Sequence, residues 1–292
     1  MRPIKRKSSE FPFGVGIPAI LWQILFFYLP LLLIVCTSFI AFSDKGDIQG
    51  LTLSKIFFFF NPTYMRVIFS SVLLGLGNAI LCFCIAYPLA YFMIFRARKI
   101  KNLLFFLLII PFWTNFLLHV YAWFFVLERN GFLNNLLKTI GLIQESIPFM
   151  NSLFATMVMM VYYYLPFMVL PLYSSLEKFD YRLIESSVDL GASWLQTLRR
   201  IIFPLTLGGI RAGFFLVYIP SFGEFAIPEL MGGDKQMFVG SVVSHYILGD
   251  QTGSLGAAFT VLSCAILSLS AVGFYYLLNM IFIPKGSYAL KK

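Results

Sequence analysis

The residues best suited to bind a charged ligand lie together in the segment Tyr218–Phe225, which reads YIPSFGEF. Its one acidic residue is Glu224, which lies between Phe222 and Phe225, and Tyr218 begins the segment. A carboxylate near aromatic rings suits an organic cation, because the cation pairs with the acid and with the electron-rich ring faces. The proline and glycine of the segment favour irregular backbone, which membrane proteins tolerate where it is buried or lines a cavity. We therefore expect a cation-binding carboxylate; the alternative is a glutamate that faces water at a helix end.

A second group of polar and aromatic residues lies in an earlier apolar segment that contains PFWTN. Trp113 and Asn115 precede Tyr121 by a few residues, so a helix places them on a partly shared face. Such a face suits a polar ligand, but aromatic residues near a membrane surface also simply anchor helices. Both interpretations stay open for Trp113 and Asn115, whereas for Trp123 we expect the anchor.

No pattern of residues in the chain predicts catalysis. The sequence contains no glycine-rich phosphate loop, no GxSxG elbow and no HExxH motif. It has only two histidines, and its four cysteines (Cys36, Cys82, Cys84 and Cys264) lie in apolar segments, where cysteine behaves as a small apolar residue. We therefore expect no enzyme activity, no metal site and no cofactor. Without a phosphate loop the chain cannot hydrolyse ATP itself, so a process driven by ATP would need a partner that does.

The elements that position these residues are long apolar helices. The chain of 292 residues is 59% hydrophobic and only 12% charged, and its mean hydropathy is +0.84. Soluble globular proteins are much less apolar, and about 20 apolar residues suffice to cross a bilayer as a helix. The pattern predicts an all-α integral membrane protein with a single domain, 1–292, and no strands alternating as in a membrane barrel. The six predicted membrane spans are 17–42, 67–95, 103–126, 152–172, 201–227 and 257–283.

The basic charge is distributed as membrane topology requires. The chain has 22 lysines and arginines against 13 acidic residues, which gives a net charge of +9. With a cytoplasmic N-terminus, most basic residues fall in cytoplasmic segments, in agreement with the positive-inside rule. We therefore expect both termini in the cytoplasm, an uncleaved first helix rather than a signal peptide, and no nucleic-acid ligand. Arg211, inside the fifth span, is expected to extend toward the inner headgroups.

Three segments outside the spans have features of their own. Residues 127–151 contain an amphipathic stretch, Phe132–Ile143, which predicts a short helix on the outer surface. Residues 228–256 contain a turn signal at Gly232–Asp234. Either loop offers a docking surface for an external protein or is a plain connector. The run Ile56–Phe60 is too short to span a membrane and predicts an interfacial segment or a short helix.

A polar segment between the fourth and fifth spans has the clearest local signal. From Glu185 to Pro204 it reads ESSVDLGASWLQTLRRIIFP. Helix signals end at Gly191, and a new helix begins where Ser193 and Gln196 form a capping-box pair. Two short helices that meet at a glycine form an angled projection, because glycine tolerates the turn of the backbone. We call residues 180–200 the knob and expect a soluble partner to bind it from the cytoplasm.

The knob resembles the cytoplasmic signature of the permeases of ATP-binding-cassette importers. That signature has a glutamate, two small residues, a glycine six positions after the glutamate, then an isoleucine and a proline. In this chain the corresponding residues are Glu185, Ser186, Ser187, Gly191, Ile201 and Pro204. Serines replace the usual alanines and Phe203 replaces the usual leucine, which preserves the small or apolar character. The resemblance implies the type I importer permease fold, with six transmembrane helices and a cytoplasmic coupling helix in residues 180–200.

Three longer stretches narrow the resemblance. They are PFWTNFLLHVYAW from Pro111, LPFMVLPLYSSLEKFDYRLIESSVDLGAS from Leu165 and YIPSFGEFAIPELMGG from Tyr218. Together they are similar to the spermidine/putrescine importer permeases, specifically the first of the two permease subunits of such systems. His119 departs from that family, in which arginine is usual near this position. The resemblance extends over most of the chain, from the first span to the last.

The narrower resemblance implies a bacterial inner-membrane complex that imports polyamines. A second permease subunit would pair with this one among the membrane lipids. A cytoplasmic ATPase dimer would bind and hydrolyse ATP, and a periplasmic or lipid-tethered binding protein would deliver the polyamine. The expected ATPase-docking residues are Arg182, Glu185, Ser186, Ser187, Asp189, Gly191, Ala192 and Ser193. The expected residues of the substrate pathway are Trp113, Asn115, Tyr121, Tyr218, Phe222, Glu224 and Glu229.

Two alternatives stay open at this point. One is an importer permease of the same class for another solute, such as an amino-acid-like cation, an opine or ferric ion. The sequence also favours neither putrescine nor spermidine. The other alternative is a carrier driven by an ion gradient, which predicts inverted repeats and acidic residues at the membrane centre. We find neither feature, and that class leaves the knob unexplained.

Overall fold

The computed structural model describes residues 13–42, 48–97, 99–233, 237–249 and 253–282. Five helices in these ranges are long and apolar enough to cross a membrane, and one bent pair of helices makes a sixth candidate. The expected all-α membrane fold is therefore confirmed, and the six predicted spans are present when the bent pair is counted as one span. The basic residues of both termini and Asp234 of the expected outer turn lie outside the described residues, as does the last residue of the sixth predicted span.

The first span is followed by a small β-hairpin rather than by more helix. The span consists of α1 (Phe13–Gln23), the π-helical turn η1 (Ile24–Tyr28) and α2 (Leu29–Phe39). Residues expected to complete it form strand β1 (Ile40–Phe42), which pairs antiparallel with β2 (Ile48–Leu51). Isoleucine and phenylalanine favour extended backbone, and β2 supplies the neighbouring strand with which β1 pairs. The short helix α3 (Ser54–Phe58) follows and includes the start of the phenylalanine run, where an interfacial segment or a short helix was expected.

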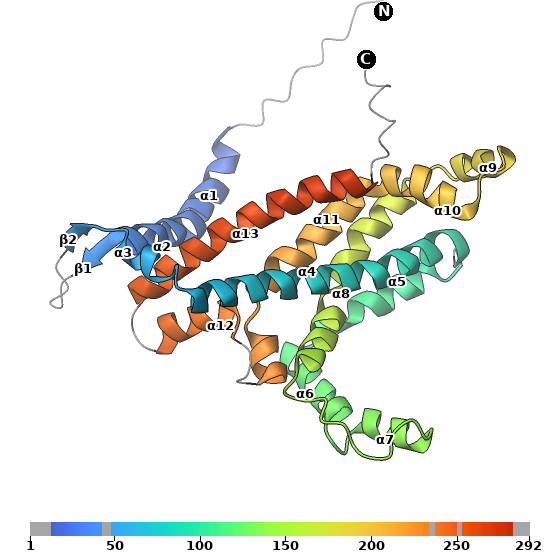
Figure 1. Ribbon diagram of the computed structural model, residues 1–292. Coiled ribbons are helices and arrows are strands. Elements are labelled where there is room, and N and C mark those ends of the chain that lie inside the picture. The colour runs from blue at the N-terminus through green and yellow to red at the C-terminus, as the bar shows by residue number, and fades with distance from the viewer. Residues whose placement is uncertain (1–12, 43–47, 98, 234–236, 250–252, 283–292) are drawn as a thin grey trace, which may run out of the picture.

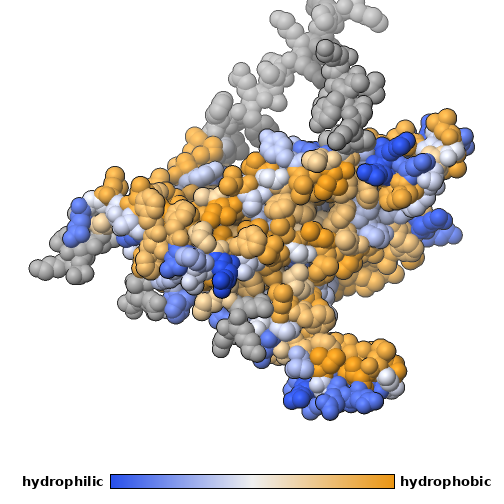
Figure 2. All heavy atoms as spheres, viewed as in Figure 1, coloured by the Kyte–Doolittle hydropathy of each residue, from blue (hydrophilic) through white to orange (hydrophobic). Residues whose placement is uncertain are grey.

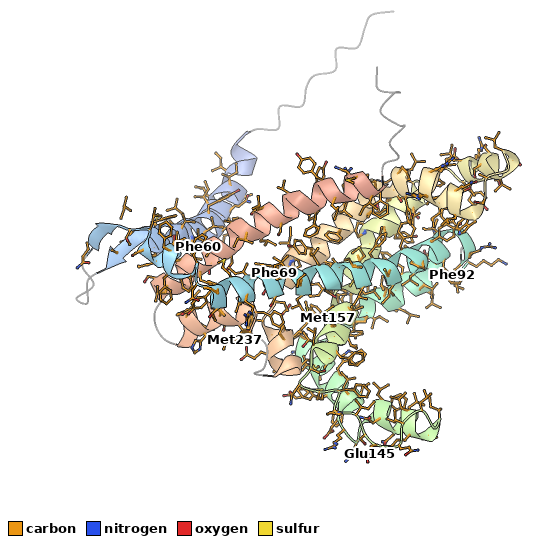
Figure 3. All side chains as sticks on the ribbon, in the orientation of Figure 1. Phe60, Phe69, Phe92, Glu145, Met157 and Met237 are labelled. Atoms are coloured by element: carbon orange, nitrogen blue, oxygen red, sulfur yellow. The ribbon has the colours of Figure 1, made fainter. Side chains whose placement is uncertain are left out.

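The second span is one long helix that begins earlier than the sequence indicated. It runs through α4 (Pro62–Tyr91) and the π-helical turn η2 (Phe92–Arg96). The side chain of Asn61 caps its first turn by accepting a hydrogen bond from the backbone N–H of Thr63. A capping asparagine followed by proline is a strong start signal, and it outweighs the apolar pattern that begins only at Val67. Figure 3 shows Phe69 and Phe92 at widely separated points along this span.

The third predicted span is broken, which corrects the expectation of a single helix over 103–126. It comprises α5 (Lys101–Ile109), the 3-10 turn η3 (Ile110–Trp113) and α6 (Phe116–Leu127), with a bend of 101° at the break. Proline in η3 cannot donate to the preceding turn, and the side chain of Asn115 starts the new helix by accepting from Leu117 N at 2.8 Å. With α7 (Phe132–Thr139), α6 forms an arm that projects from the bundle (Figure 1).

The fourth and fifth spans enclose the knob. α8 (Leu153–Glu177) is followed by α9 (Arg182–Asp189) and α10 (Trp194–Thr197), and the chain then continues without a break through η4 (Leu198–Ile202) into α11 (Phe203–Phe222). The knob lies at one end of the bundle and the β-hairpin at the other (Figure 1). The fifth span ends at Phe222 and not at Ile227, so Glu224 lies beyond its helix.

The connection after the fifth span, which was expected on the outer side, is more regular than the sequence indicated. It contains the π-helical turn η5 (Pro228–Gly232), α12 (Val239–Ser244) and the π-helical turn η6 (His245–Gly249) before the last span, α13 (Gly253–Phe282). Small residues such as Gly240 allow this close folding, because a β-carbon there would lie 2.4 Å from the carbonyl oxygen of Gly223.

The centre of the molecule is formed by α4, α8 and α11, each of which contacts the other two. Gly209 and Gly213 of α11 lie against α8, where a β-carbon on Gly209 would be 2.6 Å from the Pro171 carbonyl oxygen and one on Gly213 would be 2.7 Å from the Met168 sulfur. Small residues four apart let membrane helices approach closely and pack by van der Waals contact. The face of the molecule seen in Figure 2 is mostly apolar, as a lipid environment requires.

Candidate functional site

The turn of the knob has the geometry that its sequence predicts. Gly191 has φ of +77°, a left-handed conformation that other residues adopt only with strain. Its N–H donates to Val188 O at 2.8 Å, and the N–H of Ala192 donates to Ser187 O at 3.0 Å, which is the Schellman pattern at the end of a helix. The capping box of Ser193 and Gln196 is present at the start of α10 and confirms the expected helix start.

The two helices of the knob are joined by a buried pair of hydroxyls. Ser187 Oγ and Thr197 Oγ1 lie 2.9 Å apart, and Ser187 also donates to Ile184 O at 2.7 Å. Both side chains are buried. Ser187 was expected among the docking residues, but the structure places its side chain between α9 and α10. It therefore fixes the angle of the knob from within.

The exposed surface of the knob combines charged residues with large apolar side chains. The polar expected docking residues other than Ser187 (Arg182, Glu185, Ser186, Asp189 and Ser193) are exposed, as is Gly191, and Ala192 is half-buried. Beside them Leu190 is 87% exposed and Leu195 is 70% exposed. Neither leucine was among the predicted docking residues, although apolar residues inside a polar segment are a usable signal. An exposed apolar patch rimmed by charge is typical of a protein-binding surface.

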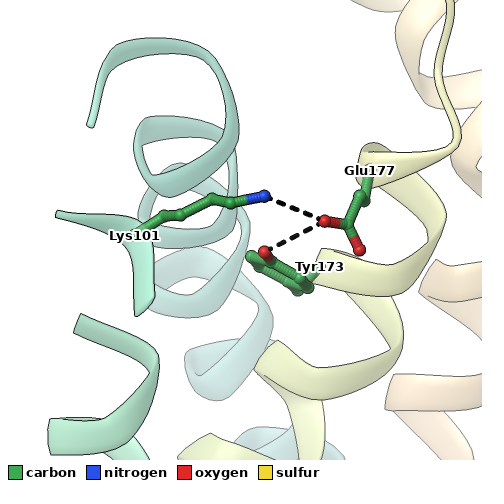
Figure 4. A network of polar contacts seen from close by, with 3 residues as sticks. All are labelled: Lys101, Tyr173 and Glu177. Atoms are coloured by element: carbon green, nitrogen blue, oxygen red, sulfur yellow. Dashed lines mark hydrogen bonds and ion pairs between the residues drawn. The ribbon is translucent and has the colours of Figure 1, made fainter. Parts of the chain in front are cut away.

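The base of the knob is tied to the start of the third span by an ion pair. Lys101 Nζ lies 3.1 Å from Glu177 Oε1, and Tyr173 donates to the same oxygen at 3.3 Å (Figure 4). The pair is exposed, so water and salt screen most of its energy. The pair marks the place where the end of α8, next to the knob, meets the start of α5.

Glu224 lies just after the end of α11 and is half-buried. Its Oε2 accepts a hydrogen bond from the Tyr164 hydroxyl at 2.6 Å, and its Oε1 accepts from Ala226 N at 3.1 Å. One oxygen thus caps the turn that leads into η5, while the other is held by α8. The carboxylate has both a structural role and a remaining exposed surface, so neither of the two interpretations from the sequence describes it fully.

The aromatic neighbours of Glu224 are not the ones expected. Tyr218 is 0% exposed and forms a hydrogen bond of 2.7 Å with Ser270 of α13, while Phe222 is buried in an apolar cluster with Phe259. The two residues are four apart on α11, so helical periodicity places them on one face, and that face packs inside the subunit.

A cluster of rings from α8 and the third span takes their place. Tyr164, which binds Glu224, contacts the rings of Tyr163 and Phe167, and these contact Phe112 and Phe116. All but Tyr164 are half-buried. The structure thus builds the expected pairing of a carboxylate with aromatic rings, but from residues that lie far from Glu224 in the sequence. Tyr164 was not among the residues predicted from the sequence.

The other expected pathway residues are dispersed. Trp113 is 78% exposed in η3 and Tyr121 is exposed on α6, so the bend between them removes the shared face that was expected. Asn115 lies between them and is used as a helix cap. Glu229 is exposed and lines a separate hollow of about 730 Å³. Trp123 is half-buried and packs edge-on against Tyr162, with ring centroids 5.6 Å apart.

Arg211 contacts protein rather than extending toward the headgroups. Its guanidinium lies 4.8 Å from the centre of the Tyr275 ring, and Nη2 donates to Asn279 Oδ1. Both partners belong to α13. Arg211 therefore joins α11 to α13, which corrects the expectation from the sequence.

Among the described residues, no group of three or more histidine, cysteine, aspartate or glutamate side chains is placed to hold a metal ion.

Known proteins with similar sequences are transport permeases. The chain is 38% identical over 265 residues to the spermidine/putrescine transport system permease protein PotB of Salmonella typhimurium strain SL1344. The aligned region covers 90% of this chain and 92% of that protein. The chain is 40% identical over 249 residues to the protein of the same name from Escherichia coli strain K12, covering 85% of this chain and 90% of the relative.

The fold is shared with a solved importer. A chain of a bacterial ABC transporter involved in the import of the acidic polysaccharide alginate aligns with a TM-score of 0.70 at 15% identity, covering 92% of this chain and 95% of the other. That likeness supports the type I permease fold. Residues 83–281, which include the knob and Glu224, match the family described as binding-protein-dependent transport system inner membrane component. The chain is therefore a multi-pass membrane protein that belongs to this family of ABC importer permeases.

Proposed function

We propose that this chain is a permease subunit of an ATP-driven polyamine importer and forms half of its translocation pathway. The names of the relatives at 38–40% identity support spermidine and putrescine as substrates. The structural observation that carries the proposal is the carboxylate of Glu224, held at 2.6 Å by Tyr164 beside a cluster of aromatic rings. Polyamines are flexible organic cations, and an acid with aromatic faces is the chemistry that recognises them.

The energy for transport comes from a partner in this proposal. A cytoplasmic ATPase dimer binds and hydrolyses ATP, and this chain itself has no cofactor and no enzyme activity. The ATPase grips the knob through Arg182, Glu185, Asp189 and the exposed leucines, and the left-handed turn at Gly191 presents these residues. Because the knob continues into α11 without a break, a movement of the knob moves the fifth span and the segment of Glu224 that follows it.

Two further partners complete the proposed complex. A second, related permease subunit forms the other half of the pathway within the lipid bilayer. A periplasmic or lipid-tethered binding protein delivers the polyamine at the outer face. One structure of the alginate transporter contains its periplasmic protein with a bound pentasaccharide, which supports delivery of this kind. The complex lies in a bacterial inner membrane, and the charge distribution of the sequence supports cytoplasmic termini.

Uptake by the reconstituted complex tests the proposal. Glu224→Gln keeps the shape of the side chain and removes its charge, so we expect weaker uptake of labelled spermidine or putrescine with normal assembly. The loss of one partly desolvated charge partner corresponds to about 1–3 kcal/mol. Glu145→Gln is the matched control, because Glu145 is exposed on the distant loop beyond α7 (Figure 3). Uptake equal to the control at subsaturating substrate would remove Glu224 from the pathway.

A complex that imports another solute is the competing function. Uptake of an amino-acid-like cation, an opine or ferric ion in place of both polyamines would replace the substrate assignment and leave the permease class intact.

A further inference from the structure

The break in the third span leaves a carbonyl group that a continuous helix would satisfy. In such a helix Pro111 O would accept from the N–H of Asn115, but Asn115 has extended backbone angles and begins α6. Three other donors surround this oxygen instead: Thr114 N at 3.2 Å, Thr114 Oγ1 at 2.7 Å and His119 Nε2 at 2.9 Å. Within a membrane an unsatisfied carbonyl costs several kcal/mol, so these contacts make the break tolerable.

His119 also reaches a third helix. Its Nδ1 lies 2.8 Å from the hydroxyl of Tyr162 on α8, while its Nε2 contacts Thr114 as well as the Pro111 carbonyl. A carbonyl oxygen only accepts hydrogen bonds, so the contact with Pro111 O is a hydrogen bond in the tautomer that carries a proton on Nε2. In that tautomer Nδ1 accepts from the hydroxyl of Tyr162. A single ring thus connects η3, α6 and α8 at the point where the span bends.

The surroundings strengthen this contact and leave room for movement. The ring borders a small cavity of about 190 Å³ whose other walls include Leu107, Phe112 and Pro166. Hydrogen bonds in such an apolar environment are stronger than in water, and losing one is correspondingly costly. The prolines on both sides of the cavity lack the N–H groups that would otherwise stiffen the two helices.

The arm held by this ring reaches the segment of Glu224. α6 contacts η5, the turn that begins shortly after Glu224. Glu224 caps the segment that leads into η5, because its Oε1 accepts from the N–H groups of Ala226 and Ile227. The direction in which α6 leaves the break therefore determines what borders the carboxylate. We propose that His119 is a positioning residue: its imidazole latches the break of the third span and holds α6 against η5. This role rests on the proposed function only for the transport measurement; the structural measurements do not depend on the substrate.

Three variants separate the latch from a general packing role. His119→Leu removes both hydrogen bonds and keeps an apolar side chain at this position. His119→Gln keeps one N–H donor for Pro111 O and one acceptor for Tyr162. Tyr162→Phe removes only the contact to α8. All are made in the assembled transporter in lipid nanodiscs, with its partner subunits present.

The structural readout does not depend on the substrate. We expect the backbone amides at the start of α6, after Asn115, to exchange hydrogen at least about tenfold faster in His119→Leu, with an intermediate effect in Tyr162→Phe and near wild-type exchange in His119→Gln. Nitrogen-15 NMR of labelled histidine should show a protonated Nε2 for His119. Because this chain has two histidines, labelling it alone in a His245→Gln background leaves one imidazole signal to assign.

Uptake should follow the same order, with a loss of about tenfold or more in His119→Leu that His119→Gln largely restores. Unchanged exchange in His119→Leu, equal defects in the leucine and glutamine variants, or an Nε2 without a proton would overturn the latch. If the complex transports a solute other than polyamines, the exchange and NMR results still decide on the latch, so the two proposals fail separately.

Discussion

Gly209→Ala should separate α8 from α11 at one of their closest contacts and destabilise the whole bundle. A β-carbon on Gly209 would lie 2.5 Å from Ser175 Cβ and 2.6 Å from the Pro171 carbonyl oxygen. Ordinary carbon contacts are about 3.5–4.0 Å, so the helices must move apart by about 1 Å. A backbone carbonyl cannot rotate out of the way as a flexible side chain can. The new methyl group is therefore expected to act as an overpacked residue.

The expected magnitude follows from two opposing terms. Overpacking a tight helix contact costs about 1–3 kcal/mol, and alanine regains up to about 1 kcal/mol through its better helix propensity. We expect the free energy of unfolding to fall by about 2 kcal/mol. This value lies toward the upper end of the range that the two terms give, because the added methyl group meets backbone atoms. The neighbouring Gly208 has nothing within 4 Å of an added β-carbon. Gly208→Ala should therefore be neutral or more stable by a fraction of a kcal/mol.

The measurement is the unfolding of both variants in the same lipid or detergent, compared with the native chain. The knob is inserted between α8 and α11, so a widened contact should also reduce uptake more than it reduces the basal ATP hydrolysis of the complex. Equal stability of Gly209→Ala and Gly208→Ala would refute the close packing of α8 against α11 at this position. Normal uptake together with lowered stability would refute the mechanical role of that packing.

The remaining predictions concern the knob and the arm. Glu185→Lys should abolish capture of the ATPase in pull-down while membrane insertion stays normal, because it places a cation where a carboxylate is expected to meet the partner; wild-type capture would remove Glu185 from the docking surface. Gly191→Pro should have the same phenotype, since proline cannot adopt φ of +77° and lacks the N–H that Gly191 donates to Val188 O. The control Gly273→Ala on α13, where an added β-carbon meets nothing within 4 Å, should bind the ATPase normally. Asn134→Leu should loosen the loop after α7 by about 1–3 kcal/mol and speed its proteolysis, because Asn134 is buried and bonds to both the N–H and the carbonyl group of Ile147. Proteolysis at the native rate would show that other contacts hold this loop.

Features encoded within a few residues were accessible from the sequence alone. The six apolar segments follow from composition and from the length of helix that a bilayer requires. The turn of the knob follows from Gly191 and the capping box from Ser193 and Gln196, because each of these contacts joins residues at most five apart. The amphipathic stretch after the third span likewise predicted α7. Local backbone chemistry determines such features whatever the rest of the chain does.

Contacts between distant segments were decided only by the tertiary structure. Glu224 was visible as a candidate, but its partner Tyr164 lies 60 residues earlier, and no local pattern joins the two. Tyr218 and Phe222 were expected beside Glu224 because they are close in sequence, yet packing against α13 and its neighbours buries them. Ser187 was expected at the surface of the knob and instead bonds to Thr197 inside it.

The bend of the third span shows the physical reason most clearly. Pro111 and Asn115 permit a break, but prolines elsewhere in the chain lie within continuous spans, as Pro88, Pro166 and Pro171 do. A helix breaks at a permissive position only where other groups satisfy the carbonyls that the break exposes. Here those groups include His119, which is itself held by Tyr162 from a different helix. The sequence determined where the third span can bend, and the packing of α8 against it decided that it does.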